Sequence, residues 1–508
     1  MISEISDIFD QDDKTIKAAM KSMMIWRKPK NLIALLAAFS LLACATAPSL
    51  RQATEQGNQD IQTAHATAKN RSAHVSPARD FEAVKGAAGK GDAEAQYHLG
   101  AIYARGQEVP KNDAEAVKWY IKAAEQGYAT AQYRLGVMYA NGRGVAQNDA
   151  EAMKWYRLAA NQGNAKAQNN LGAMYGNGHG VTQDDAEAMK WYTKAAEQGN
   201  AIAEHNLGFM HSSGSGIAKD DAEAVKWYTK AAEQGDAIAQ HNLGVMYENG
   251  RGVKHSDIEA MKWYRLAAAQ GDGKAQNNLG TMYAAGQGVA QDNVEAVKWY
   301  RLAADQKDTN AQNNLGWMYD RGQGVMQDSV EAVKWYRLAA DQGDASGQNN
   351  LGWMYKNGRG VARDAAEAVK WYRLAANQGN ADAENNLGLM YYVGEGVEQD
   401  MIEATKWYTK AAIQGNTDAA GNISLVILHF AADVMATANA ESQEDTPTWH
   451  EDSKKPSKSP KTPAKPPDMS PAMKNAHEPP RPSASSVENT RNEAPPPKDT
   501  TVHRFKWN

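Results

Sequence analysis

The apolar residues in the central part of the chain recur at helical spacing in two alternating patterns. In the first pattern, seen at Ala95, Leu99 and Ile102, apolar side chains lie three or four residues apart and so share one face of a helix. In the second pattern, seen at Ala116 and Trp119, aromatic residues alternate with small ones at the same spacing. Together the two patterns predict pairs of short amphipathic helices.

These helix pairs repeat with a fixed period. Trp-Tyr pairs occur every 36 residues from Trp119-Tyr120 to Trp407-Tyr408, and Leu-Gly pairs keep the same step from Leu99-Gly100 onward. A helical hairpin of this length cannot bury its apolar face alone, so adjacent copies must stack. The pattern predicts an all-α fold, an α-solenoid of nine 36-residue helix-turn-helix repeats over residues 92–415.

The residues at the helix ends support this division. Asp92 is expected to cap the first helix, and Gly106 to end it in a left-handed conformation. The second helix opens with Asn112 and Glu115, a capping box in which each side chain is expected to satisfy the other's exposed amide. Lys307 occupies a position that is glycine in the other repeats, so we expect a strained corner there.

Composition divides the rest of the chain. Thirteen of the 17 prolines lie between Pro447 and Pro497, among Lys, Ser and Glu, so the C-terminal segment is expected to be disordered, as is the N-terminal tether. The predicted segments are a leader and signal peptide (1–44), a flexible tether (45–79), a partial repeat (80–91), the nine repeats (92–415), a capping helix (416–438) and a Pro/Lys/Ser-rich tail (439–508).

The N-terminus has the composition of an export signal. A basic stretch leads into the apolar segment 32–43, which is too short to cross a hydrocarbon core of about 30 Å. The residues Leu41-Leu42-Ala43-Cys44 resemble the lipobox of bacterial lipoproteins, and this resemblance implies an acyl anchor on Cys44. Because Ala45 follows the cysteine, the resemblance favours the outer membrane of a Gram-negative cell, with the protein facing the periplasm. Cleavage at the small residues around position 44, giving a soluble periplasmic protein, is the alternative, and a later start codon is also open.

The charge and the reactive residues exclude several functions. A net charge of −5 offers no basic face for nucleic acid. His205, His211 and His241 have no carboxylate or cysteine spaced to complete a metal site, so neither a metal nor another cofactor is expected. We find no constellation of nucleophile, base and metal, and therefore expect a protein that is not an enzyme.

The repeat sequence A-x-A-Q-x-x-L-G-x-M-Y-x-x-G, followed by E-A-x-K-W-Y-x-x-A-A-x-Q-G, resembles the Sel-one-like repeat family, a branch of the tetratricopeptide superfamily. This resemblance implies a right-handed superhelix whose first helices line a concave face, and a role as an adaptor for protein complexes. Some secreted relatives are linked to β-lactam binding or hydrolysis. The chain lacks both their paired cysteines and a Ser-x-x-Lys motif, so β-lactamase-like activity is only a weaker alternative.

Two columns of residues on the first helices are candidates for binding a partner. The first could form an amide ladder for an extended peptide: Asn170, Asn206, Asn242, Asn278, Asn314, Asn350 and Asn386. The second lies three residues further on and is apolar: Phe209, Val245, Trp317, Trp353 and Leu389. The alternatives are that asparagine belongs to the repeat consensus and that the rings only pack between adjacent first helices.

These observations lead to one preferred function and one alternative. The preferred function is an envelope-anchored, monomeric scaffold that binds a periplasmic protein or peptide through its concave face. The alternative is a structural spacer whose tail contacts the cell wall. The sequence does not identify the partner.

Overall fold

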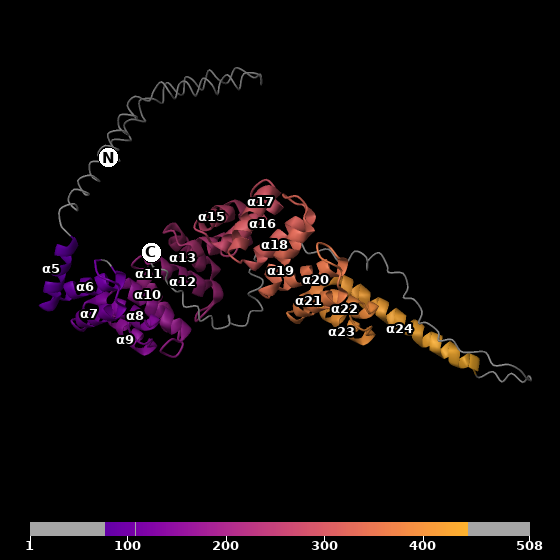
Figure 1. Ribbon diagram of the computed structural model, residues 1–508, viewed down its shortest axis with the longest axis horizontal. Helices are drawn as coiled ribbons and strands as arrows, with labels where there is room; N and C mark the ends of the chain where they lie inside the picture. The colour runs from indigo at the N-terminus through magenta and orange to yellow at the C-terminus, as the bar shows by residue number, and fades with distance from the viewer. Residues whose placement is uncertain (1–76, 107, 445–508) are drawn as a thin grey trace, which may run out of the picture. The chain divides into compact units, whose positions relative to one another are not determined.

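The computed structural model describes residues 77–106 and 108–444, and the regular elements of this part of the chain are all α-helices (Figure 1). They include nine successive helix pairs, as the sequence predicts. The first helices of the pairs are α6 (Ala93–Arg105), α8 (Ala129–Asn141), α10 (Ala165–Asn177), α12 (Ala201–Ser213), α14 (Ala237–Asn249), α16 (Gly273–Ala285), α18 (Thr309–Arg321), α20 (Ala345–Asn357) and α22 (Ala381–Val393). The second helices are α7 (Asp113–Glu125), α9 (Asp149–Asn161), α11 (Asp185–Ala196), α13 (Asp221–Glu233), α15 (Asp257–Ala269), α17 (Asn293–Asp305), α19 (Ser329–Asp341), α21 (Ala365–Asn377) and α23 (Met401–Ile413). Helix α5 (Pro77–Gly89) precedes the pairs and α24 (Thr417–Glu444) follows them.

Helix α5 packs against α6 in the way that a second helix packs against the first helix of the next repeat. The side-chain amide of Gln96 donates to the backbone oxygen of Ala88 at 3.2 Å. The rings of Phe81 and Tyr103 meet edge to face, with 6.4 Å between their centroids. The partial repeat predicted for residues 80–91 therefore has its helix, α5, in the place of a second helix in front of the first repeat.

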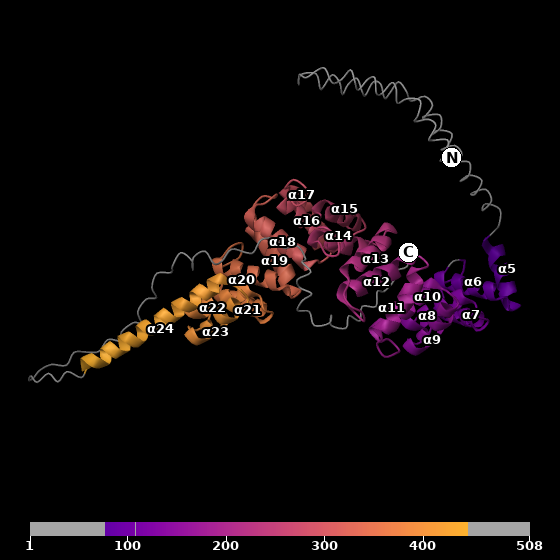
Figure 2. The same ribbon diagram turned by 180° about the vertical axis from the view of Figure 1, so that it is seen from behind.

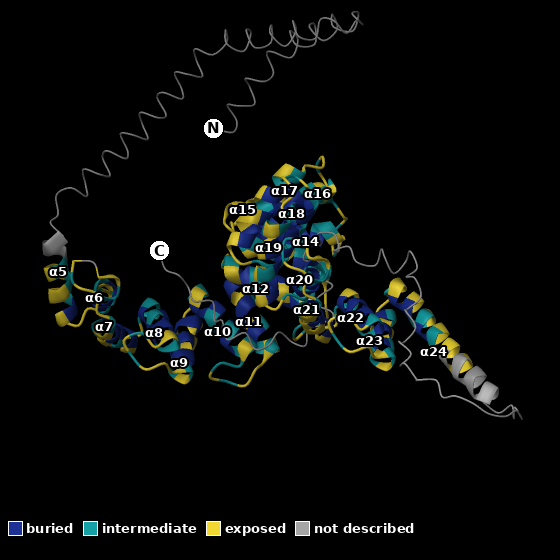
Figure 3. Ribbon diagram, turned by 45° about the vertical axis from the view of Figure 1, so that its right-hand side comes forward, coloured by how far each residue is buried: buried dark blue, intermediate teal, exposed yellow. Residues whose placement is uncertain are grey.

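From residue 120 onward the chain forms a second compact unit, in which consecutive helices pack on one another in chain order (Figures 1 and 2). The apolar clusters combine residues of neighbouring repeats, and the last one combines residues of the final repeat and of α24. One cluster joins Tyr300 of α17, Leu315 of α18 and Trp335 of α19. Tyr300 and Leu315 are completely buried, and each burial stabilises the stack by about 2 kcal/mol. Figure 3 shows buried residues as dark-blue ribbon on the neighbouring helices α16 to α19. A single repeat therefore cannot bury its core without its neighbours.

The glycine of each Leu-Gly pair sets the distance between the two helices of a repeat. A Cβ atom at Gly280 would lie 2.6 Å from the ring of Tyr300, closer than a side chain tolerates. The same distance is 2.6 to 2.9 Å at each of the other glycines of this column in the second unit, which are Gly136, Gly172, Gly208, Gly244, Gly316, Gly352 and Gly388. The absence of a side chain at these glycines therefore lets the second helix approach the first closely.

A relay of side-chain amides connects successive repeats. Gln162 donates to the Oε1 atom of Gln132 at 2.7 Å, and Gln132 donates to the backbone oxygen of Ala124 in the preceding repeat at 3.1 Å. Two repeats have Glu204 and Glu384 at the position of Gln132. Their carboxylates accept the first bond but cannot donate the second while they are ionised. Burial raises the pKa of both carboxyl groups, against the opposing effects of nearby lysines and of the glutamine bonds.

The variant Glu204→Gln is expected to raise the free energy of unfolding by about 1 kcal/mol at neutral pH, because its amide can donate to the backbone oxygen of Ala196. The raised pKa gives this gain a defined pH dependence. The native protein is most stable when Glu204 is protonated, below the pKa that this carboxyl group has in the unfolded chain. That stability is lost as the pH rises through the higher pKa of Glu204 in the folded protein. Urea denaturation at acidic and at neutral pH should show the gain growing with pH, and an equal gain at both values would contradict this explanation.

The capping boxes of the second helices form only in part. Asn148 accepts from the backbone N–H of Glu151 at 3.1 Å, as predicted. The prediction that the Glu151 carboxylate accepts from the backbone N–H of Asn148 is wrong, because this N–H already donates to the backbone oxygen of Tyr139 at 3.0 Å. The Glu151 carboxylate instead pairs with Lys154 at 3.2 Å, and the same pairing of glutamate with the lysine three residues on recurs in the other second helices.

The remaining predictions about the chain's ends and corners have different outcomes. Lys307 adopts φ 69°, so the predicted left-handed corner is confirmed. Helix α24 continues to Glu444, beyond the predicted boundary at residue 438. Helix α5 begins at Pro77, so the predicted end of the tether at residue 79 is wrong, and Cys44, residues 45–76 and residues 445–508 lie outside the described residues. Within the described ranges, none of the helices combines the length and apolar character that crossing a membrane requires.

Candidate partner-binding surface

The predicted asparagine column is aligned along the first helices, and its amides donate to the side chain that lies one residue before the column position in the preceding repeat. Asn314 donates to Asn277 at 3.0 Å, and the same bond joins each later first helix to the one before it. These later bonds run from Asn350 to Asn313, from Asn386 to Asn349 and from Asn422 of α24 to Asn385, at 2.8 to 2.9 Å. Earlier in the stack, Asn206 donates to Asn169 at 3.1 Å, and Asn278 lies 3.4 Å from the Nε2 atom of His241.

This arrangement gives the column a structural role between repeats. Asn278, Asn314, Asn350 and Asn386 are buried, whereas Asn170, Asn206 and Asn242 are half-buried. A buried amide must keep its hydrogen bond, so these bonds fix the register of neighbouring first helices. Binding of a peptide backbone by the column stays a prediction, and the burial of the first four residues argues against it.

The apolar column differs in exposure from repeat to repeat. Val245 and Leu389 are buried, Trp317 and Trp353 are half-buried, and Phe209 is 51% exposed. The expectation of an exposed apolar face is therefore wrong for Val245 and Leu389, which the adjacent helices cover. The two tryptophans pack on the clusters of neighbouring repeats and also reach the surface.

One guanidinium group lies over a tryptophan ring, and a second lies near the carboxylate with which the first one pairs. Arg359 stacks over the Trp353 ring at 5.3 Å from its centroid. It also pairs with the carboxylate of Asp320 at 2.9 Å, and Arg321 lies 3.9 Å from the same carboxylate. The Asp320 side chain is fully buried, whereas those of Arg321 and Arg359 are 26% and 32% exposed. We name Trp317, Trp353, Arg321 and Arg359 the tryptophan–arginine surface.

Buried charges continue beyond this surface into the next repeats. Burial, followed by the nearby Asp320 carboxylate, raises the pKa of the Tyr336 phenol well above its ordinary value. At the position of Asp320 in the next repeat, burial lowers the pKa of Lys356 to about 8, although the Glu395 carboxylate opposes this change. Arg363 forms an ion pair with Glu395. The ends of the first helices of repeats 7 and 8 thus each place a charged residue, Asp320 or Lys356, where repeat 5 has Glu248.

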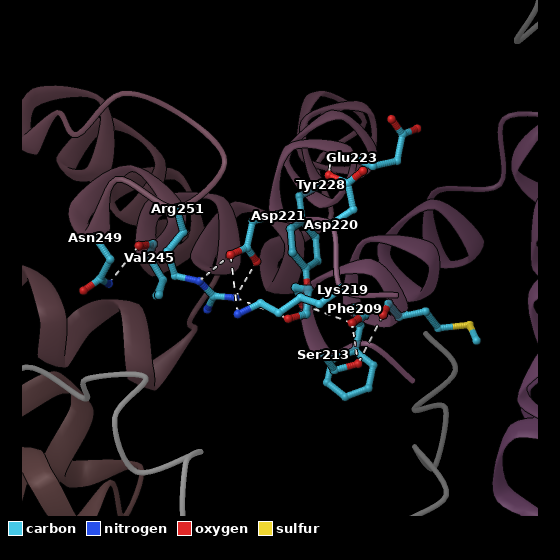
Figure 4. A network of polar contacts seen from close by, with 12 residues as sticks. Phe209, Ser213, Lys219, Asp220, Asp221, Glu223, Tyr228, Val245, Asn249 and Arg251 are labelled. Carbon is cyan, nitrogen blue, oxygen red and sulfur yellow. Dashed lines mark hydrogen bonds and ion pairs between the residues drawn. The ribbon is translucent and has the colours of Figure 1, made fainter. Parts of the chain in front are cut away.

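Phe209 on α12 is the most exposed apolar residue of the predicted column, and in Figure 4 its ring points away from the polar network around it. Arg251 of the next repeat bonds to Asp221 through Nη2 at 2.5 Å and through Nε at 3.2 Å. Its Nη2 atom also donates to the backbone oxygen of Ser212 at 3.3 Å. Burial alone would raise the pKa of Asp221, but the bonds to Arg251 hold it below its ordinary value. These contacts join repeats 4 and 5 and support the segment that carries Phe209.

Two of the histidines that the sequence singles out, His205 and His241, each lie one residue before the asparagine column. The Nδ1 atom of His205 lies 3.6 Å from the Asp236 carboxylate, and His241 is buried beside Asn278. Within residues 77–106 and 108–444, the structure has no group of three or more His, Cys, Asp or Glu side chains placed to hold a metal ion.

Comparison with protein families identifies the repeats. The family model described as the Sel1 repeat matches nine consecutive segments without a gap, from residues 93–128 to residues 381–416. The chain belongs to the Sel1 repeat family. Its Sel1 repeats form a solenoid scaffold of a kind that typically mediates protein–protein interaction.

Solved structures include other Sel1 repeat proteins. A protective antigen present in uropathogenic Escherichia coli strains is 37% identical, with a TM-score of 0.53, over 68% of this chain and 82% of that one. A Sel1 repeat protein from Oxalobacter formigenes is also 37% identical, with a TM-score of 0.48, over 61% of this chain and 89% of that one. A comparison with curated proteins found no match.

Sequence reasoning missed the charged part of the surface on Sel1 repeats 7 and 8. The position of Asp320 is alanine or glycine in four of the six earlier repeats, so its departure from small residues, which Glu248 shares, was a usable signal. The partner, Arg359, lies in the turn of the next repeat, 39 residues away. Pairing these two residues required the register between stacked repeats, which the structure supplies.

Proposed function

We propose that this chain is a cell-envelope scaffold that binds a protein or peptide through the tryptophan–arginine surface on repeats 7 and 8. The observation that carries the proposal is the placement of Trp353 beneath Arg359, whose guanidinium is oriented by a buried carboxylate. Tryptophan and arginine dominate the binding energy of protein interfaces, and a ring held in place loses little entropy on binding.

The chemistry of the surface defines the kind of partner. The indole rings offer apolar contact, and each has a buried Nε1–H that has no hydrogen-bond partner among the described residues. Arg321 and Arg359 retain exposed donor capacity beside these rings. A segment with an apolar side chain next to a carboxylate or backbone oxygen complements this arrangement. Phe209 lies on α12, three repeats before Trp317 in the sequence, so it is not required for this contact.

The location of the scaffold is also a proposal. The lipobox-like residues before Cys44 support an acylated lipoprotein in the outer membrane of a Gram-negative cell, facing the periplasm. Labelled palmitate should enter the wild-type chain and not the Cys44→Ser variant. Absence of label from both forms would favour the soluble periplasmic alternative.

The double variant Trp317→Ala with Trp353→Ala is expected to weaken partner capture from envelope extracts by 30-fold or more, on the order of 2 kcal/mol. The matched control is Leu338→Ala with Leu374→Ala, which shortens two side chains that are each 47% exposed on second helices. Quantitative mass spectrometry of proteins retained by each immobilised chain measures the effect. Circular dichroism should confirm that both variants stay helical.

Deletion of residues 440–508 separates this function from the spacer alternative. The scaffold proposal expects the deletion to leave capture unchanged, whereas a spacer that contacts the cell wall through its tail would lose its binding. Equal capture by the tryptophan variant and the leucine control would contradict the proposed surface. We also propose that the chain is not an enzyme, and nitrocefin turnover that survives purification would overturn that proposal.

A further inference from the structure

The C-terminal helix α24 presents an apolar surface that no later repeat covers in the described residues. The first helices of the nine pairs have 13 residues each, whereas α24 has 28. Five of its apolar side chains are 50% to 68% exposed: Ile427, Leu428, Phe430, Val434 and Met435. Figures 1 and 2 both show the end of α24 extending past α23. An apolar surface of this kind marks a contact site.

The two ends of α24 have different environments. Its N-terminal part is built into the stack through the bond from Asn422 to Asn385 and the burial of Ala419 and Val426. The C-terminal part continues as a helix although its apolar side chains face solvent. Isolated helices of this length are marginal in water, and stability comes from packing of the apolar face. The extension therefore calls for a covering partner.

An open groove of about 540 Å³ lies beside the exposed face. It is lined by Ile402, Thr405, Lys406, Thr409 and Lys410 of α23 and by Phe430 of α24. Two lysines border this depression: Lys406, which pairs with Glu403 at 2.9 Å, and Lys410, whose ammonium lies over the Trp407 ring at 4.0 Å. The α24 sequence has four carboxylates, at positions 418, 433, 441 and 444, and contains no lysine or arginine. The helix and the groove are complementary in charge and in apolar character.

A tenth second helix in the usual position does not fit this end. The repeats have glycine where the tyrosine ring of the second helix packs, and a Cβ there would lie 2.6 to 2.9 Å from that ring. Ser424 occupies this position in α24. The end of the stack is therefore closed to another repeat of the same geometry and needs a different occupant.

We propose that the occupant is a second copy of this chain, and that the two copies form a symmetric dimer through α24. Ile423, Ile427, Phe430 and Val434 are spaced alternately by four and three residues, the pattern of a helix that pairs with another helix. A two-fold axis brings this stripe against its own counterpart and places each acidic α24 near the lysine-bordered groove of the other copy. The dimer replaces the monomer expected from the sequence. It does not depend on the tryptophan–arginine surface, which lies on other helices.

Disulfide crosslinking of the full chain in intact cells tests this pairing, because residues near a two-fold axis meet their own counterparts. Ile427→Cys, Phe430→Cys and Val434→Cys are made singly, and each retains Cys44. The control is Met326→Cys, at a side chain that is 89% exposed in a turn. After mild oxidation, non-reducing gels should show a dimer band for at least one α24 variant, at five-fold or more the yield of the control and of the wild type.

A second substitution checks that the dimer forms through the stripe. Adding Ile427→Asp to Phe430→Cys should reduce the dimer yield to the level of the control, because a carboxylate cannot be buried without a partner. Dimer yields for all three α24 variants no higher than that of Met326→Cys would overturn the proposal, as would a dimer that persists with Ile427→Asp. A segment of the same chain or another protein covering α24 would give the first of these results.

Discussion

Gly172→Ala is expected to lower the free energy of unfolding by about 2 to 3 kcal/mol, whereas Gly176→Ala in the same helix should raise it by up to about 1 kcal/mol. A Cβ atom at Gly172 would lie 2.8 Å from the Tyr192 ring, so α11 must move away from α10. The Cβ of an alanine at position 176 meets only Ala188 at 3.6 Å and Tyr192 at 4.0 Å, which are ordinary contacts. Removing a helical glycine there reduces the entropy of the unfolded chain.

Hydrogen exchange followed by mass spectrometry measures both variants and locates their effects. Because the apolar clusters are shared between repeats, Gly172→Ala should lower protection in α9 and α12 as well as in α10 and α11. Gly176→Ala provides the matched control for a methyl group added to the same helix. Loss of protection limited to the mutated repeat would show that the repeats are stable individually, contrary to the stacked core.

Arg359→Ala is expected to destabilise the stack by about 3 kcal/mol, because it leaves the fully buried carboxylate of Asp320 without its closest cation. Asp320→Ala should cost less, about 2 kcal/mol, since the two arginines it releases are partly exposed and can turn toward water. The double variant should be close to Asp320→Ala in stability, which corresponds to a coupling of about 2 to 3 kcal/mol.

Urea denaturation of the wild type, the two single variants and the double variant completes this cycle. Strictly additive effects would indicate that the pair contributes nothing specific, and that Arg359 is held by other contacts. The pair also links stability to function in this account. Asp320→Ala should weaken partner capture even where the chain stays folded, because Arg359 then loses the group that orients it over Trp353.

The fold follows almost directly from the sequence, because its determinants recur in every repeat. The spacing of the Leu-Gly and Trp-Tyr pairs predicts the helix pairs. The Tyr300 ring packs so closely that position 280 must be glycine. Lys307 is predictable for the same reason, since a left-handed corner is set locally by the position of glycine in the other repeats.

The candidate surface is less predictable because it depends on contacts between repeats. Helical spacing places Trp353 and Leu389 in one column, but only the packing of the final repeats buries Leu389. The sequence likewise predicts that the amides of the asparagine column are free to bind a peptide. The stacking of neighbouring first helices shows instead that Asn350 bonds to Asn313. Asp320 joins an arginine of the next repeat, a pairing that the pattern within one repeat does not contain.

A photocrosslinking residue placed at Asn357 tests the central claim most directly. This exposed position lies one helical turn after Trp353, and Asp341 on the second helix α19 is the exposed control. Irradiation of cells that express each full-length variant should give a discrete protein adduct at position 357, absent at position 341 and lost when Trp353→Ala is added. Equal adducts at both positions, or an adduct at position 341 only, would contradict a binding surface on the first helices of repeats 7 and 8.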